Sequence, residues 1–106
     1  MNTQNRRRFP RIKFPHHLGV LHRGTYTVFA GDEIGEGGLS FYCCQDYFKI
    51  GDRLVLTIMT VGPMCVEAIV RNQRHSSDGT IFGVEFIDLN FDQARRLRFY
   101  VLQGQT

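Results

Sequence analysis

The chain contains no tryptophan, only three cysteines and three prolines, and no long apolar run. An odd cysteine count with an adjacent pair, Cys43 and Cys44, is not a disulfide framework. We expect one of the pair to be a small core residue, because neighbours on a strand point to opposite faces. The four histidines lack the spacing with the cysteines that zinc requires, so no metal site is expected. Without a membrane-length apolar stretch or an apolar signal core, we expect no membrane insertion and a cytoplasmic location.

The patterns of the common enzyme classes are also missing. There is no pair of carboxylates with an adjacent base, no serine or cysteine nucleophile within an identifiable motif, and no Walker-type loop with its lysine. The glycines at positions 35, 37 and 38 do not match the dinucleotide fingerprint, and they lie between predicted strands rather than before a helix. The sequence therefore predicts a protein that is not an enzyme and that carries no cofactor.

What is present is an ordinary globular composition with an uneven distribution of charge. With 106 residues, of which 42% are hydrophobic and 22% charged, the chain is long enough for one apolar core and too short for two. The net charge is +3, but four of the thirteen lysines and arginines lie between positions 6 and 11. A second cluster, Arg95, Arg96 and Arg98, is expected on the solvent side of a helix. This distribution favours anionic partners such as nucleotides, nucleic acid or acidic protein surfaces.

Short segments rich in β-branched and aromatic residues alternate with turn signals along the middle of the chain. An Arg-Gly pair at 23–24 indicates a tight hairpin, and Ser-Asp-Gly at 77–79 indicates another hairpin loop. The predicted strands are 18–22, 25–30, 39–43, 53–59, 65–72 and 80–87. Short strands at this spacing predict an all-β fold, a small antiparallel barrel of six or seven strands that is closed or nearly closed.

The pattern changes to a helical period near the C-terminus. Asn90 is a good N-cap, Gln93 stands at the partner position of a capping box, and apolar residues then recur at helical spacing. We expect a helix over 91–103 that closes the open end of the barrel. The chain is thus predicted to consist of a flexible Arg-rich arm, 1–13, and a barrel domain with a C-terminal helix, 14–106.

Two signals point to a ligand. Arg7 and Arg11 lie four positions apart, and Pro10 disfavours a helix at this point, so the segment is expected to be extended. In an extended chain the two arginines share a face and lie roughly 13 Å apart. A Gly-rich turn at 33–38 offers backbone amides that can cradle an anion. Guanidinium groups can grip phosphate oxygens or the O6/N7 edge of guanine, although a solvated basic tail is the alternative interpretation.

These two elements carry a resemblance to a known family. The spacing Arg7-x-x-x-Arg11, followed by an Asp-x-Ser-x-x-Gly-like element before a strand, resembles the signature of PilZ domains, which bind the bacterial second messenger cyclic di-GMP. Segments 49–52, 68–71 and 82–86 look like further landmarks of that family. The resemblance extends over nearly the whole chain and implies a PilZ-like barrel.

The second element departs from the family pattern at two positions. In the register set by residues 37–41, Glu33 stands at the Asp position, Gly35 at the Ser position and Gly38 at the Gly position. Glutamate keeps a carboxylate that can accept from a guanine, but Gly35 lacks the hydroxyl, a loss of about 1 kcal/mol. A register shifted to Asp32 restores the Asp, but it places Ile34 at the Ser position and ranks second.

The resemblance implies a cyclic di-GMP receptor or adaptor module. Its arm would order on ligand binding and signal to an unidentified partner protein. In this interpretation Arg7 and Arg11 clamp the ligand, and Arg6 adds an auxiliary charge. Glu33 accepts from a guanine, and Gly35 and Gly38 provide backbone contacts. The alternative is a PilZ-fold adaptor that no longer binds the nucleotide because of its degenerate second motif. A single-stranded nucleic-acid binder is less well supported, because the phenylalanines mostly alternate inward.

Overall fold

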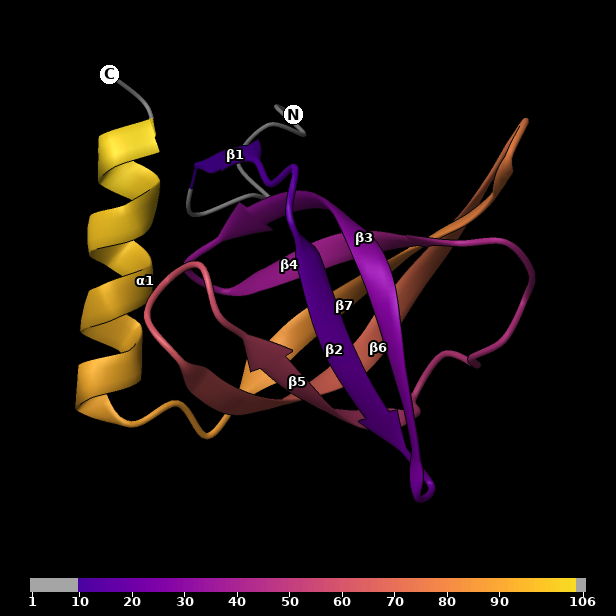
Figure 1. The fold of residues 1–106 in the computed structure, drawn as a ribbon, viewed down its shortest axis with the longest axis horizontal. Helices are drawn as coiled ribbons and strands as arrows, with labels where there is room; N and C mark the ends of the chain where they lie inside the picture. The colour runs from indigo at the N-terminus through magenta and orange to yellow at the C-terminus, as the bar shows by residue number, and fades with distance from the viewer. Residues whose placement is uncertain (1–9, 105–106) are drawn as a thin grey trace, which may run out of the picture.

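The computed structural model describes residues 10–104, which form seven strands and one helix (Figure 1). Arg6 and Arg7 lie outside the described part of the chain. The elements are β1 (Arg11–Lys13), β2 (His17–His22), β3 (Thr25–Gly35), β4 (Gly38–Cys43), β5 (Arg53–Ile58), β6 (Met64–Ser76), β7 (Gly79–Ile87) and α1 (Phe91–Gly104).

Six of these strands close into an antiparallel barrel. The order β3-β2-β5-β6-β7-β4 returns to its start because β4 also pairs with β3, and β1 adds a further strand to β3. Every pairing is antiparallel. Closure pairs the strand edges that would otherwise remain exposed. The predicted all-β barrel with a C-terminal helix is therefore confirmed.

The barrel interior is apolar and rich in phenylalanine. Side chains alternate inward along each strand, as in β5, where Leu54, Leu56 and Ile58 are buried. Phe48, from the connection between β4 and β5, contributes a ring 5.9 Å from Phe41 and 5.3 Å from Phe82, measured between centroids. Cys43 is buried while Cys44 is exposed, which confirms the prediction for this pair.

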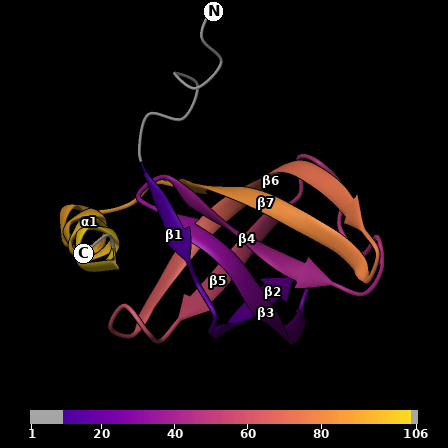
Figure 2. The same cartoon turned by 90° about the horizontal axis from the view of Figure 1, so that it is seen from above.

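Helix α1 begins with the predicted capping box. The Gln93 amide N–H donates to Asn90 Oδ1 over 2.8 Å, and the Asn90 N–H donates to Gln93 Oε1 over 3.2 Å. Leu97 and Val101 are fully buried, so the helix packs its apolar stripe against the barrel. Figure 2 shows α1 beside β1, at one end of the barrel. The helix is too short and too polar to span a membrane, and the residues between 10 and 104 include no other helix.

Three segments differ from their sequence-based description. Residues 11–13, assigned to the arm, pair with β3 as strand β1. Strand β3 does not end at position 30 but continues through Gly35, so residues 33–35 are not part of a turn, and only Glu36 and Gly37 connect β3 to β4. Strand β6 likewise continues past residue 72 to Ser76, because its polar end pairs with β7.

Candidate functional site

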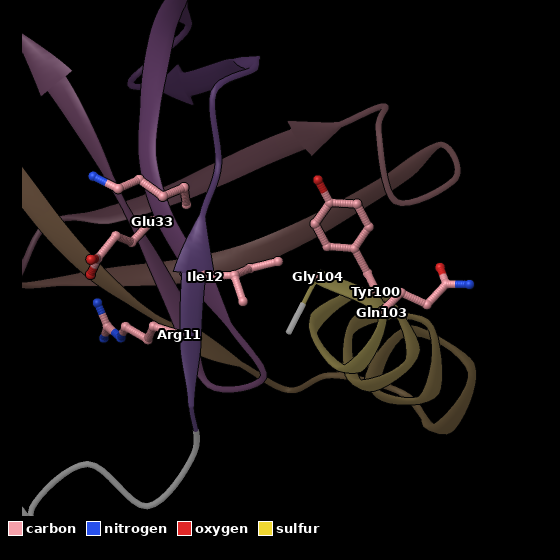
Figure 3. Close-up of a pocket in the computed structure, with 7 residues that line it drawn as sticks. Arg11, Ile12, Glu33, Tyr100, Gln103 and Gly104 are labelled. Carbon is pink, nitrogen blue, oxygen red and sulfur yellow. The ribbon is translucent and has the colours of Figure 1, made fainter. Parts of the chain in front are cut away.

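The described part of the arginine motif and the second motif meet in one strand pair. Arg11 lies opposite Gly35, and Lys13 lies opposite Glu33, in the β1–β3 register. Because Arg11 and Lys13 are two positions apart, they share one side of β1. Figure 3 shows Arg11 and Glu33 on this side, with their charged ends turned toward one another, and Ile12 on the opposite side facing Tyr100. The fold thus brings together three of the predicted ligand-binding residues, Arg11, Glu33 and Gly35.

Glycine at position 35 allows β1 to approach β3 closely. A Cβ atom on Gly35 would lie 3.0 Å from the Pro10 carbonyl oxygen and 3.2 Å from Arg11 Cγ. Gly38 is packed even more tightly, since a Cβ atom there would lie 2.1 Å from the Val84 carbonyl oxygen on β7. Both glycines are buried. Close backbone packing therefore explains why both positions are glycine, independently of any ligand contact by their backbone amides.

Asp32 occupies a β-bulge and is held by its own neighbours. The Ser40 hydroxyl donates to Asp32 Oδ2 and the Tyr42 hydroxyl to Asp32 Oδ1, each over 2.9 Å. Arg74 Nη2 lies 3.8 Å from Asp32 Oδ2, and only 14% of the Asp32 side chain is exposed. The hydrogen bond that Tyr42 donates to the Asp32 carboxylate raises the pKa of Tyr42 above its usual value. Both carboxylate oxygens of Asp32 are therefore engaged by side chains of β4.

A polar hollow of about 210 Å³ lies on the outer face of the barrel beside Arg11. It is lined by Arg11, Asp32, Glu33, Ser40, Asn72, Arg74, Ile81 and Gly83. A second hollow, also of about 210 Å³, adjoins it and is lined by Arg11, Gly37, Arg71, Asn72, Gly83, Val84 and Glu85. Arg11 is common to both. The two hollows therefore adjoin on one face of the barrel, formed by β3, β4, β7 and β6, and the Arg11 side chain lines both of them.

A larger hollow of about 630 Å³ lies where β1 meets the end of α1 (Figure 3). Its lining includes Arg11, Lys13 and Glu33 as well as Ile12 and Tyr100. Ile12 packs at the helix end, since a Cβ atom on Gly104 would lie 2.3 Å from Ile12 Cδ1. The charged side of strand β1 therefore lines the site, and its apolar side packs against the end of α1.

The charges of this face suit a ligand that combines phosphate with hydrogen-bonding bases. Arg11 and Arg74 provide guanidinium groups, which bind phosphate oxygens or the O6/N7 edge of guanine. Glu33 provides a carboxylate that can accept from guanine N–H groups. Arg71 Nε instead lies 2.6 Å from Glu85 Oε1, so this arginine is already paired. Among residues 10–104, no three His, Cys, Asp or Glu side chains cluster as metal ligands.

Sequence reasoning missed the contribution of β6 to this face. Arg71 was noted only as part of a family landmark, and Asn72 and Arg74 were not singled out. They reach the face because β6 runs beside β7, where Asn72 lies opposite Gly83 and Arg74 opposite Ile81. This placement depends on a register shift between Val70 and Asn72, for which the local sequence gives no signal. Arg6 and Arg7 lie outside the described residues, so their positions relative to Arg11 stay a prediction.

Several solved structures share this fold. The inhibitor of motility MotI (DgrA) of Bacillus subtilis superposes with a TM-score of 0.81 at 18% identity, over 93% of this chain and 51% of that one. The PilZ domain of YcgR from Escherichia coli, solved with c-di-GMP, superposes with a TM-score of 0.74 at 15% identity, over 94% of this chain and 92% of that one. The MrkH–c-di-GMP complex of K. pneumonia superposes with a TM-score of 0.74 at 18% identity, over 92% of this chain and 51% of that one.

The chain spans about half the length of MotI and of MrkH. No curated protein matches it. The family model of the PilZ domain, by contrast, matches residues 5–103, nearly the whole sequence and both of its motifs. Together with the six-stranded barrel and the pairing of the two motifs, this match establishes that the chain belongs to the PilZ domain family.

Proposed function

We propose that this PilZ domain is a receptor module for cyclic di-GMP. The observation that carries the proposal is the β1–β3 register, which sets Arg11 directly opposite Gly35 and so joins the two ligand motifs of the family in one site. Family membership supports it, as do the PilZ domain of YcgR and MrkH, whose structures contain c-di-GMP. No cofactor or catalytic step is part of the proposal.

Each chemical group of the ligand has a counterpart in the site. The phosphates are anionic and suit the Arg11 guanidinium, with Arg7 and Arg6 adding charge from the segment before β1. A guanine offers N1–H and N2–H₂ donors, which suit the Glu33 carboxylate. Gly35 and Gly38 stay in the proposal as backbone contacts, although neighbouring backbone packs against both of them.

Binding would couple to the segment that precedes β1. In this proposal the ligand holds that segment against the barrel and creates a surface that an unidentified partner protein recognises, within the bacterial cytoplasm. Ordering a segment subtracts from the affinity, so we expect micromolar rather than nanomolar binding.

Calorimetric titration with cyclic di-GMP tests the proposal. Arg11→Ala should weaken binding about tenfold or more, because a hydrogen bond to a charged group contributes about 1.5–3 kcal/mol. The matched control is Arg95→Ala, which removes one exposed arginine from α1, where it pairs with Asp92 rather than with the site. Absence of heat with the wild-type protein at millimolar ligand, or equal binding by both variants, would contradict the proposal.

A second candidate is a PilZ adaptor that binds a protein and no nucleotide. It is favoured by the Gly35 departure and by the tight fit there, since the side chain of the usual serine would begin 3.0 Å from the Pro10 carbonyl oxygen. Amide NMR spectra with and without cyclic di-GMP separate the two candidates. Shift changes confined to the N-terminal segment and residues 31–40 support the receptor, and unchanged spectra support the adaptor.

A further inference from the structure

The polar end of β6 extends the proposed ligand site beyond the two family motifs. Across the outer face of the barrel, Ser40 lies opposite Gly83, and Gly83 lies opposite Asn72. In the neighbouring row of side chains on the same outer face, Ile81 lies between Tyr42 and Arg74. Because Glu33 also pairs with Ser40, Glu33 and Asn72 belong to one row of side chains, with Ser40 and Gly83 between them. The hollow is therefore bounded by Glu33 on β3 and by Asn72 and Arg74 on β6.

The absence of a side chain on Gly83 lets Asn72 lie over β7. A Cβ atom on Gly83 would lie 2.4 Å from Asn72 Oδ1 and 2.8 Å from its Nδ2, so the carboxamide occupies the space that any other residue would fill. The register shift between Val70 and Asn72 brings Asn72 into line with Gly83. A group with both a donor and an acceptor is thereby set against the floor of the hollow.

Arg74 lies at the rim of the same hollow and is held there by charge. Its Nη2 atom is 3.8 Å from Asp32 Oδ2, which is longer than a hydrogen bond, so the contact is electrostatic. Asp32 is itself oriented by Ser40 and Tyr42. The Arg74 side chain is 68% exposed, so its guanidinium edge remains open to a ligand while the nearby carboxylate limits its position.

We propose that Arg74, assisted by Asn72, is a specificity-determining residue that reads the guanine held by Glu33. Guanine presents donors at N1 and N2 and acceptors at O6 and N7, so a carboxylate on one side of the hollow and a guanidinium on the other match two different edges of the base. Adenine lacks the N1–H donor and has an amino group in place of O6, which would set donor against donor at Arg74. This inference rests on the proposed receptor function and adds selection of cyclic di-GMP over cyclic di-AMP.

The test is a pair of calorimetric titrations, with cyclic di-GMP and with cyclic di-AMP, on wild type, Arg74→Ala, Arg74→Lys and Arg95→Ala. For the wild type we expect at least tenfold preference for cyclic di-GMP. Arg74→Ala should lose most of that preference, chiefly through weaker binding of cyclic di-GMP. Arg74→Lys should keep only part of that preference, because an ammonium can still donate to O6 or N7 but lacks the planar fork. Arg95→Ala should match the wild type.

The outcomes separate the two proposals. If the wild type binds neither nucleotide, the receptor function itself fails. If it binds cyclic di-GMP and Arg74→Ala retains the full preference, the receptor stands and the role of Arg74 is wrong. Equal weakening of both nucleotides in Arg74→Ala would also overturn base reading, since it would show that Arg74 contributes only charge. Equal thermal unfolding of all four proteins excludes misfolding as the cause, as expected for exposed side chains.

Discussion

Arg11 and Gly35 face one another across the β1–β3 ladder, with the glycine leaving only enough space for the backbone of β1. We therefore expect Gly35→Val to displace β1, because a branched side chain would meet the Pro10 carbonyl oxygen and Arg11 Cγ. Amide hydrogen exchange at residues 11–13 should accelerate and cyclic di-GMP binding should weaken at least tenfold. Gly24→Ala is the control. Its φ of +82° makes alanine cost about 1–2 kcal/mol, but a Cβ atom there has no atom within 4 Å and should not affect β1. Unchanged exchange in Gly35→Val would contradict this account.

Gly38→Ala is expected to destabilise the barrel itself. Its Cβ atom would lie 2.1 Å from the Val84 carbonyl oxygen, a backbone atom that cannot move without disturbing the β4–β7 ladder. We expect a loss of about 1–3 kcal/mol in the free energy of unfolding, measured by urea denaturation. Gly83→Ala provides the comparison, because the clash there is with the Asn72 side chain, which can rotate away. Equal losses in the two variants would argue against this distinction.

The Tyr42–Asp32 hydrogen bond predicts a specific alkaline titration. Donation to the Asp32 carboxylate raises the pKa of Tyr42 above 10.0 in the folded protein. The stability that this bond contributes is fully present below the unfolded-state pKa, and it is lost as the pH rises through the raised folded-state pKa. The difference in unfolding free energy between wild type and Tyr42→Phe should therefore shrink above about pH 10. In a tyrosinate absorbance titration, Asp32→Asn should return the Tyr42 pKa toward its ordinary value, and an unmoved titration would refute the assignment.

The capping box of α1 should be measurable on its own. Asn90→Ala removes the acceptor for the Gln93 amide and should cost about 1 kcal/mol in the free energy of unfolding. Gln93→Ala should cost at least as much, because the Gln93 side-chain amide also donates to the Cys65 carbonyl oxygen over 2.8 Å. Urea denaturation followed by circular dichroism measures both changes. No loss in either variant would mean that tertiary packing alone fixes the start of the helix.

Much of the architecture followed from local patterns in the sequence. Strands β2, β4, β5 and β7 and helix α1 could be predicted because their apolar positions alternate with period two or recur at helical spacing, between clear turn signals. The Arg23–Gly24 hairpin was predictable for the same reason, and both residues have positive φ. In these elements the local preference and the tertiary environment agree.

The parts that could not be predicted depend on pairing between distant segments. Strand β1 has three residues with no useful alternation, and it is a strand only because β3 offers an edge to Arg11–Lys13. Residues 33–35 begin the Gly-rich segment 33–38, which reads as a turn. They pair with β1 on one side, and Glu33 and Ile34 pair with β4 on the other. Arg74 entered the site through the β6–β7 register, which no local pattern of a polar segment specifies. Among the candidate site residues, Arg11 is indicated by its spacing from Arg7, whereas Glu33, Gly35 and Gly38 are assigned through the family resemblance rather than through periodicity.

Ile34 pairs with Ile12 across one edge of its strand and with Leu39 across the other, and its side chain is fully buried. Because separating this rung breaks two ladders together, the backbone between Glu33 and Gly35 should open only when the whole protein denatures. This part of the proposed ligand site is then rigid before any ligand binds. In the proposed receptor, the conformational entropy lost on binding would fall chiefly on the segment before β1. Substitutions upstream of position 10 should then tune affinity without altering the shape of the polar hollow.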